Sequence, residues 1–301
     1  MSRGAWLGVF LGVIALGIAL AVLTQLATGG SETTTTSAAT TASASGQFDL
    51  PLALQSRTLA LAQHHGDVVV GIAARPGGPV EVAAVRGEDP LGDVRITLDG
   101  RTVTSEPCGR GCSRITEPVL NGRTIALAVE TGATPFTFTL PRRLPASGAK
   151  DFARARRTMA ALRSYHFTER LSSGSGAILT RLDVQAPDRL RLRTDNGFRS
   201  VIIGGTRWDY LDGRWQRQSF PGLNVRDVLM WYRARTPRVV RRDANGATEL
   251  AAFSLQPVPS WFRLIVEPSG RVSQARMTAP SHFMLHRYSE YDRAPEITPP
   301  K

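Results

Sequence analysis

The segment Arg189–Gln218, RLRLRTDNGFRSVIIGGTRWDYLDGRWQRQ, constrains the fold of this chain most strongly. Apolar and polar residues alternate along it, as half-buried β-strands require. Asp195-Asn196-Gly197, Gly204-Gly205 and Asp212-Gly213 interrupt the alternation with the residues that tight hairpin turns favour, because those turns need positive φ. The segment is therefore predicted to form consecutive strands of an antiparallel meander with one aromatic face.

The same alternation extends over the C-terminal half of the chain and predicts a long series of strands. They are Tyr165–Ser172, Ile178–Gln185, Arg189–Thr194, Phe198–Ile203, Arg207–Leu211, Arg214–Ser219, Val239–Asp243, Thr248–Leu255, Trp261–Glu267, Arg271–Ala279 and His282–Tyr291. So many strands do not form a flat sheet. We expect residues 146–301 to curl into a half-barrel that encloses an apolar space.

Two helices accompany the predicted half-barrel. A short one, Val225–Ala234 capped by Asn224, interrupts the strands. The other, Asp151–Arg163, is expected to lie on the concave side of the sheet. Its apolar face carries Phe152, Ala155, Met159 and Leu162, and its polar face carries Arg154, Arg156, Arg157 and Arg163. The basic face either docks on acidic lipid or is simply solvated, as runs of charge usually are.

The region before the half-barrel is also predicted to be β-structure. Between Leu59 and Pro141, short apolar strands alternate with glycine, proline and Asp-Gly turns. Several short strands at this spacing indicate an immunoglobulin-like β-sandwich, which we assign to residues 56–145. The chain is thus predicted to be mainly β.

The N-terminus predicts attachment to a membrane. Ala5–Ala27 is almost wholly apolar, and at 1.5 Å per residue it spans roughly 34 Å. Arg3 precedes it, so the N-terminus is expected in the cytoplasm and the rest outside the cytoplasmic membrane. Residues 1–28 are therefore interpreted as a single-pass anchor; a cleaved signal peptide is the alternative. Residues 29–55, rich in Gly, Ser, Thr and Ala at first, are predicted to be a flexible linker.

The net charge indicates which classes of partner the protein can bind, and the two cysteines indicate a disulfide. A net charge of +12 and a pI near 10.9 favour anionic partners such as phospholipid head groups or acidic cell-wall polymers. Nucleic acid is not expected outside the cytoplasm. Cys108 and Cys112, four positions apart in CGRGC, are predicted to form a local disulfide. A two-cysteine metal or redox site is the alternative.

The sequence predicts no enzyme and no cofactor, because G-x-S-x-G, H-E-x-x-H and phosphate-binding glycine loops are all absent. A copper site is a lesser hypothesis. His282, Met284 and His286 point to one side of a strand, and imidazole with thioether suits Cu(I). Alternatively the histidines lie on the convex face, with Phe283 and Leu285 facing the cavity. His64-His65 is a further surface pair, more typical of a solvated loop.

Aromatic residues are the basis of the main functional hypothesis, a carrier for a lipid or another hydrophobic ligand. The residues predicted to line its cavity are Phe167, Trp208, Tyr210, Trp215, Phe253, Phe262 and Phe283. A half-barrel lined in this way offers the apolar cleft that lipid chains need. The alternative is that these rings fill an ordinary core against the helix.

Particular strings resemble known bacterial proteins. RSYHFTERLSS, APDRLRLRTDNG, VIIGGTRWDYLDGRW, PSWFRLIVEPSG and MTAPSHFMLHRY resemble the soluble C-terminal region of CopD-type copper-resistance membrane proteins, and GDVVVGIAARPG with CGRGC is similar to the domain before it. The half-barrel also resembles the LolA/RseB/LprG group, whose members hold lipids or lipid-linked chains. The CopD bundle of membrane helices has no counterpart here, so copper transport does not carry over. The resemblances imply a role in copper or envelope homeostasis, as a ligand carrier, a copper-binding accessory protein or a sensor ectodomain with a membrane-protein partner.

Overall fold

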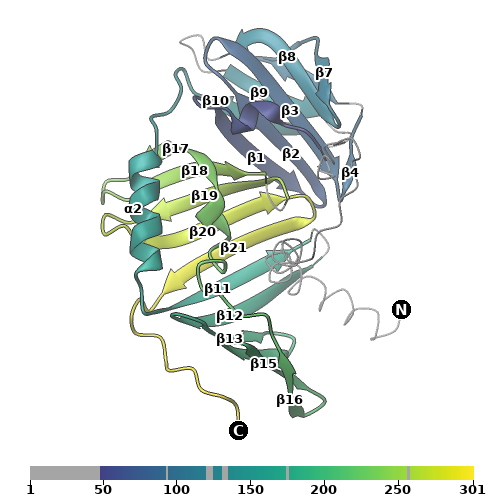
Figure 1. Cartoon of the computed structure of the whole chain (residues 1–301). Coiled ribbons are helices and arrows are strands. Elements are labelled where there is room, and N and C mark those ends of the chain that lie inside the picture. The colour runs from purple at the N-terminus through teal and green to yellow at the C-terminus, as the bar shows by residue number, and fades with distance from the viewer. Residues whose placement is uncertain (1–47, 93, 120–124, 131–134, 174–175, 256–257) are drawn as a thin grey trace, which may run out of the picture.

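The structure, a computed structural model of the chain, describes residues 48–301 apart from 93, 120–124, 131–134, 174–175 and 256–257. The predicted anchor and residues 29–47 of the predicted linker lie outside the described residues. Within the described ranges, no helix has both the length and the apolar character needed to cross a bilayer. Figure 1 shows a small β-sheet body above a large curved sheet, with one helix laid over the large sheet.

Two small sheets pack face to face in the first part of the described chain. One has the strand order β1-β2-β3-β8-β7, with β4 beside β3, and the other has the order β10-β9-β5-β6. Buried side chains of both sheets, among them Ile72, Val82, Phe136 and Phe138, fill the space between them. The strands are β1 (Leu59–His65), β2 (Val68–Ala74), β3 (Gly78–Arg86), β4 (Asp89–Pro90), β5 (Arg95–Leu98), β6 (Arg101–Thr102), β7 (Glu106–Gly109), β8 (Cys112–Val119), β9 (Ile125–Glu130) and β10 (Pro135–Leu140).

The strand order of this sandwich differs from the predicted immunoglobulin-like arrangement. Immunoglobulin sheets have the orders A-B-E-D and C-F-G, so strand C moves to the other sheet after strand B. Here β1, β2 and β3 follow one another as a meander within one sheet. Gly66 and Gly77, with φ of 58° and 60°, lie in the short turns that return the chain to that sheet. Alternation and turn residues predict strands, but they do not determine which sheet a strand joins.

The segment before β1 is packed, so the linker prediction is wrong for residues 48–55. Phe48, Leu50 and Leu52 are buried, and Pro51–Leu54 forms the short 3-10 helix η1. The backbone N–H of Leu52 donates to Oε2 of Glu81 on β3 at 2.7 Å. The reason is compositional: the apolar residues that begin at Phe48 bury enough surface to offset the entropy lost when the chain is ordered.

Glu81 holds this segment and a neighbouring strand in place. It is only 1% exposed, and its Oε1 accepts hydrogen bonds from Nε and Nη2 of Arg114 at 3.2 and 2.6 Å. We expect Glu81→Ala to lower the free energy of unfolding by about 3–5 kcal/mol, because a buried N–H and a guanidinium lose their acceptor. Glu81→Gln keeps an acceptor oxygen and should cost only about 1–2 kcal/mol. Urea denaturation measures both; equal losses for the two variants would contradict this explanation.

The C-terminal part is one antiparallel sheet with the order β16-β15-β14-β13-β12-β11-β21-β20-β19-β18-β17. All of the predicted strands are present, and only β17 begins well before its predicted start at Val239. The strands are β11 (Ser164–Ser172), β12 (Ala177–Gln185), β13 (Arg189–Thr194), β14 (Arg199–Ile203), β15 (Thr206–Leu211), β16 (Arg214–Ser219), β17 (Arg235–Arg242), β18 (Thr248–Ser254), β19 (Ser260–Val266), β20 (Val272–Ala279) and β21 (His282–Ser289).

The predicted turns of the Arg189–Gln218 meander are confirmed. Gly197, Gly204 and Gly213 have φ of 94°, 55° and 78°, which lie in the left-handed region that glycine adopts without strain. Asp212 also has a positive φ, of 51°. These residues let each strand reverse directly into the next, as the order of β13 to β16 requires.

The main helix, α2, spans Ala149–Ala160 and lies over β17 to β20 in Figure 1. It begins slightly before and ends slightly before the predicted range. Phe152, Ala155 and Met159 are buried in one cluster with Leu264 of β19, so the predicted apolar face is confirmed. The helix and the sheet thus enclose the largest cluster of buried side chains described in the chain.

The second predicted helix, Val225–Ala234, is wrong over most of its length. The structure has a 3-10 helix, η2, only at Met230–Arg233. Before it, the N–H of Asp227 donates to the carbonyl of Asn224 at 2.8 Å, which is a turn and not an α-helical bond. Trp231 is 1% exposed, so packing of this segment on the core outweighs its helical pattern.

The sandwich covers the face of the large sheet that is turned away from α2. Phe48 stacks on Trp261 of β19, with ring centroids 5.5 Å apart, and His64 stacks on Phe283 of β21 at 3.6 Å. Gly71 of β2 lies against the same indole: a Cβ there would come within 2.0 Å of Cζ2 of Trp261. The two parts therefore share a continuous apolar contact.

Candidate ligand-binding site

The aromatic residues predicted to line one cavity lie on two faces of the large sheet. We call the face towards α2 the inner face and the opposite one the outer face. Phe167 and Phe262 belong to the inner face, whereas Trp208, Tyr210, Trp215, Phe253 and Phe283 belong to the outer face. The prediction of a single aromatic lining is therefore wrong.

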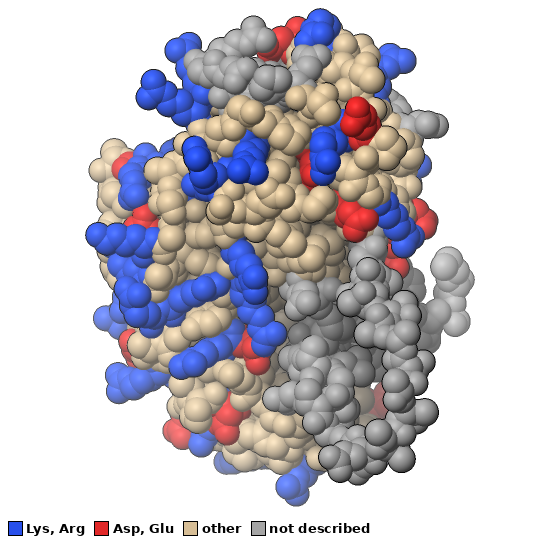
Figure 2. Space-filling model, turned by 45° about the horizontal axis from the view of Figure 1, so that its top comes forward, with Lys and Arg blue, Asp and Glu red and all other residues tan. Residues whose placement is uncertain are grey.

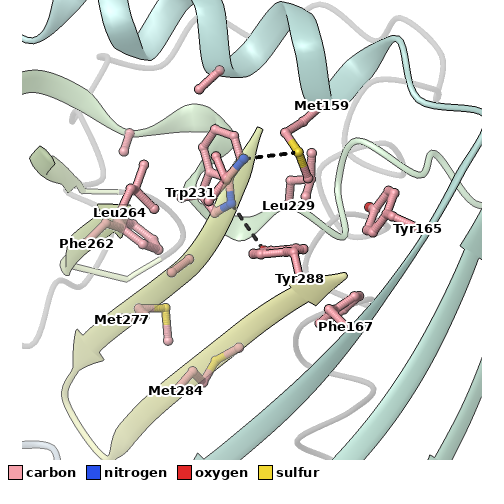
Figure 3. Close-up of a cluster of buried hydrophobic side chains, with 14 of the residues drawn as sticks. Met159, Tyr165, Phe167, Leu229, Trp231, Phe262, Leu264, Met277, Met284 and Tyr288 are labelled. Atoms are coloured by element: carbon pink, nitrogen blue, oxygen red, sulfur yellow. Dashed lines mark hydrogen bonds between the residues drawn. The ribbon is translucent and has the colours of Figure 1, made fainter. Parts of the chain in front are cut away.

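On the inner face, the side chains beneath α2 form a packed core. Phe167 and Phe262 are 1% and 4% exposed, and Figure 3 shows them in the cluster that also contains Met159 and Trp231. Trp231 packs edge-on against Phe152 of α2, with centroids 5.8 Å apart. These two predicted ligand-binding rings thus contribute to the core that holds α2 on the sheet.

Trp208, Tyr210 and Trp215 lie on the outer face because of the strand register. Ile202 of β14 is part of the inner core, and it pairs with Arg207 of β15. Arg207 therefore faces inward, and the next residue, Trp208, faces outward because side chains alternate. Tyr210 follows the same parity and pairs with Trp215. All three rings are half-buried.

Phe253 and Phe283 belong to the contact with the sandwich. Phe253 is 0% exposed and lies 5.3 Å, centroid to centroid, from Trp261. Phe283 is 6% exposed beneath His64. Sequence alternation alone cannot reveal this, because these strands are covered on both faces.

The predicted copper ligands do not form a free set of donors. Met284 and His286 share the inner face of β21, which contradicts the alternative that placed the histidines on the convex side. Both ring nitrogens of His286 are already engaged: Nε2 lies 2.7 Å from Oε2 of Glu169, and Nδ1 lies 3.1 Å from the hydroxyl of Tyr288. Nδ1 of His282 lies 3.1 Å from the carbonyl of Pro280. No copper role is supported by this arrangement.

The polar groups around His286 form a chain through the inner core. Nε1 of Trp231 donates to the hydroxyl of Tyr288 at 3.2 Å, as Figure 3 shows, and that hydroxyl in turn meets His286. Burial raises the pKa of Tyr288 above its ordinary value, and burial likewise raises the pKa of Tyr165. Each polar group thus has a partner, and the tyrosines remain neutral donors at physiological pH.

The other candidate metal groups are also occupied. The disulfide between Cys108 and Cys112 is confirmed. In the described part of the chain, one cluster of metal-ligating residue types appears, made of these two cysteines and Glu81, and the disulfide removes both thiols. His64 stacks on Phe283, whereas His65 packs against Phe136 at 4.6 Å, so the two imidazoles do not act as a pair. Burial lowers the pKa of His64.

An open pocket lies where α2 begins, between the helix, η2 and the adjoining ends of β17 and β18. Its volume is about 690 Å³, within the range of small-molecule sites. Phe152 of α2 and Tyr232 of η2 form aromatic walls, and Leu54 and Leu255 line it as well. Leu54 and Leu255 are 41% and 40% exposed, so they present apolar surface at the pocket.

Arg156 supplies the charge in this pocket. Its guanidinium lies 4.4 Å from the ring centroid of Phe152 and 5.4 Å from that of Tyr232, and Nη2 donates to the carbonyl of Ala234 at 2.7 Å. Nε is buried and has no hydrogen-bond partner among the described residues. Desolvation lowers the pKa of Arg156. The interaction with Tyr232 raises this pKa, whereas the positive charge of the nearby Arg235 lowers it. The group remains cationic and would gain from a bound anion.

The surroundings of the pocket are basic. Arg233 and Arg235 also line it. On the left of Figure 2, the side on which α2 lies in Figure 1, Lys and Arg side chains predominate over Asp and Glu. An apolar pocket with a cationic wall suits a molecule that has both an apolar part and an anionic group.

A second pocket, of about 810 Å³, lies at the edge of the sandwich beside the disulfide. Leu91, Arg95, Glu106 and Ser113 are among its lining residues, and it is the more polar and open of the two. It offers no concentrated apolar surface. We therefore place the candidate site at α2 although this second pocket is larger.

The pocket is not predictable from the sequence. The sequence pattern places Arg156 on the polar side of the helix, where solvation is the usual outcome. The pocket needs Leu54, Phe152, Tyr232 and Leu255, which are brought together only by the tertiary fold. The signal available in the sequence was weak: an arginine one turn after Phe152 on an amphipathic helix.

Comparisons with known proteins give the following findings. No protein-family model and no curated protein matches the sequence. Among solved structures, the chain is similar to the lipoprotein LppX of Mycobacterium tuberculosis, with 13% identity, a TM-score of 0.38, and coverage of 50% of this chain and 97% of that one. It is also similar to LprF from Mycobacterium bovis, with 10% identity, a TM-score of 0.38, and coverage of 52% and 98%. The resemblance to CopD-type proteins finds no support in these comparisons.

Proposed function

We propose that this protein is a membrane-tethered, extracytoplasmic binding protein whose half-barrel takes an anionic amphiphile, such as a lipid, at the pocket beside the start of α2. The observation that carries the proposal is the pocket itself, in which the half-buried Arg156 stands between Phe152 and Tyr232. The anionic group contacts Arg156, and the apolar part lies against Leu54 and Leu255. The tether is the predicted anchor at residues 1–28.

Binding in this position requires no catalytic chemistry. A charge-assisted hydrogen bond to Arg156 contributes about 1.5–3 kcal/mol, which is a factor of roughly 10 to 100 in affinity. The exposed leucines add the apolar contact. The inner core beneath α2 then serves as a rigid support and not as the ligand chamber predicted from the sequence.

Native mass spectrometry of the full chain, released from nanodiscs that contain equal amounts of phosphatidylglycerol and phosphatidylcholine, tests the proposal. We expect wild-type protein to retain phosphatidylglycerol preferentially. Arg156→Gln should reduce that preference about tenfold, whereas Arg157→Gln, on the exposed side of the same helix, should leave it unchanged.

A second pair of variants tests the apolar wall. Leu54→Asn with Leu255→Asn should reduce retention of both lipids. Val240→Asn alters another exposed large hydrophobic residue, 37% exposed and outside the pocket, and should have no effect. Retention that is equal in wild type, Arg156→Gln and the leucine variant would exclude this pocket as the binding site.

A further inference from the structure

The outer face carries a row of arginines that the amphiphile pocket does not use. In the register of β12, β13 and β14, Arg181 pairs with Arg193, and Arg193 pairs with Arg199. Thr168 of β11 continues the row from Arg181 and pairs on its other side with Arg287 of β21. We call Arg181, Arg193, Arg199 and Arg287 the arginine row. It runs across five neighbouring strands on one face of the sheet.

The arginine row lacks acidic partners within the described chain. All four side chains are exposed, and none makes an ion pair with a described residue. Side chains directly opposite in a sheet have Cβ atoms about 5 Å apart, and like charges at such positions destabilise the pairing. Three consecutive arginines in register are therefore unfavourable for the protein alone, and an external anion would remove that repulsion.

The acidic residue nearest in register is already occupied. Asp183 faces outward on β12, one step along the strand alternation from Arg181. Its Oδ1 lies 2.8 Å from Nδ1 of His166, and its Oδ2 lies 2.7 Å from Nη2 of Arg191. Asp183 therefore neutralises a neighbouring arginine and not the arginine row.

Three half-buried aromatic rings continue the row towards the sheet edge. Arg199 pairs with Tyr210, and Tyr210 pairs with Trp215. The guanidinium of Arg199 lies 5.3 Å from the centroid of Tyr210, and that of Arg217 lies 6.0 Å from the centroid of Trp208. Tryptophan and tyrosine gather at the boundary between lipid head groups and acyl chains, and arginine binds phosphate with two hydrogen bonds.

We propose that the outer face of β11 to β16 docks on an anionic lipid bilayer, with the arginine row on the phosphates and Trp208, Tyr210 and Trp215 at the head-group level. A soluble polyanion would neutralise the arginines, but it would not offer the three aromatic rings the interfacial environment that a bilayer provides. The bilayer is within reach, because the sequence predicts an anchor at residues 1–28 followed by a linker, and a flexible chain as long as residues 29–47 would span roughly 24 Å.

The test uses the full chain in nanodiscs of neutral phosphatidylcholine, mixed with sedimentable vesicles. We expect wild-type nanodiscs to sediment with vesicles that contain phosphatidylglycerol and not with phosphatidylcholine vesicles. High salt should abolish the effect. Arg181→Gln, Arg193→Gln and Arg199→Gln together should weaken the binding about 100-fold, at roughly fivefold for each arginine near an anionic surface.

The matched control removes the same charge elsewhere. Arg86→Gln, Arg142→Gln and Arg143→Gln together change three exposed arginines of the sandwich or the segment after it, and they should leave vesicle binding within about twofold of wild type. Trp215→Ser should weaken binding while retaining its salt dependence. Equal loss in the two triple variants would overturn the proposal, because net charge alone would then explain binding. Binding to soluble polyphosphate but not to vesicles would overturn it as well.

Discussion

Replacing Gly71 with alanine is expected to destabilise the contact between the sandwich and the large sheet severely. The added Cβ would lie 2.0 Å from Cζ2 and 2.4 Å from Cη2 of Trp261. The indole cannot retreat, because Phe48 stacks on it and Phe253 packs beside it. Overpacking a core in this way costs about 3 kcal/mol. Thermal unfolding followed by near-ultraviolet circular dichroism should show a transition shifted to lower temperature.

Two further variants make the Gly71 result specific. Gly176→Ala adds the same methyl group where no described residue beyond its chain neighbours has an atom within 4 Å, and it should change stability by less than about 0.5 kcal/mol. Gly71→Ala combined with Trp261→Phe removes the ring atoms that the new Cβ would meet, so it should recover part of the stability lost by Gly71→Ala alone. A Gly71→Ala protein as stable as wild type would contradict the interface described above.

Trp231→Ala is expected to have the second large effect, because Trp231 joins η2, α2 and the sheet. The side chain is 1% exposed and contacts Phe152 and Tyr232. Its loss leaves a cavity and removes the donor to the hydroxyl of Tyr288. The free energy of unfolding should fall by about 3–5 kcal/mol, measured by urea denaturation.

The matched control for Trp231→Ala is Trp215→Ala on the outer face, where the ring is only half-buried. It should cost about 1 kcal/mol or less. Because Phe152 and Tyr232 also form walls of the pocket, Trp231→Ala should weaken amphiphile binding, whereas Trp215→Ala should not. Similar losses of stability in both variants would mean that η2 is not fixed by this tryptophan.

The strands and hairpins were predictable because their causes are local. The period of two is a property of neighbouring residues, and Gly197, Gly204 and Gly213 adopt the left-handed backbone that their turns need. The same locality explains why Val225–Ala234 was predicted as a helix. Its pattern is helical, but the burial of Trp231 in the core decides its conformation.

The sequence does not predict whether a given set of side chains faces α2 or the opposite side of the sheet, because this depends on which elements cover each face. The alternation predicts that Trp208 and Tyr210 share a face of the sheet, but it does not predict which face. Trp261 and Phe262 are adjacent and both buried, one against the sandwich and one beneath α2. Two adjacent apolar residues in a strand therefore indicate that the strand is buried on both faces.

The pocket was not predictable for a related reason: its walls come from distant segments. Arg156 and Arg157 are adjacent and of the same residue type, so the sequence does not show which of them contributes to a site. In the structure Arg156 lies over Phe152 in the pocket, whereas Arg157 is exposed. A difference of one position, about 100° around a helix, separates a candidate ligand-binding cation from a solvated one.

Photo-crosslinking of the full chain in vesicles tests the central claim, that an amphiphile binds beside the start of α2, most directly. A phosphatidylglycerol with a diazirine at the end of one acyl chain should label peptides that contain Leu54 and Leu255, the apolar wall of the pocket. Head-group contacts on the outer face would not be labelled, because the reactive group lies at the chain end. Label confined to residues 1–28, with none at Leu54 or Leu255, would contradict the claim.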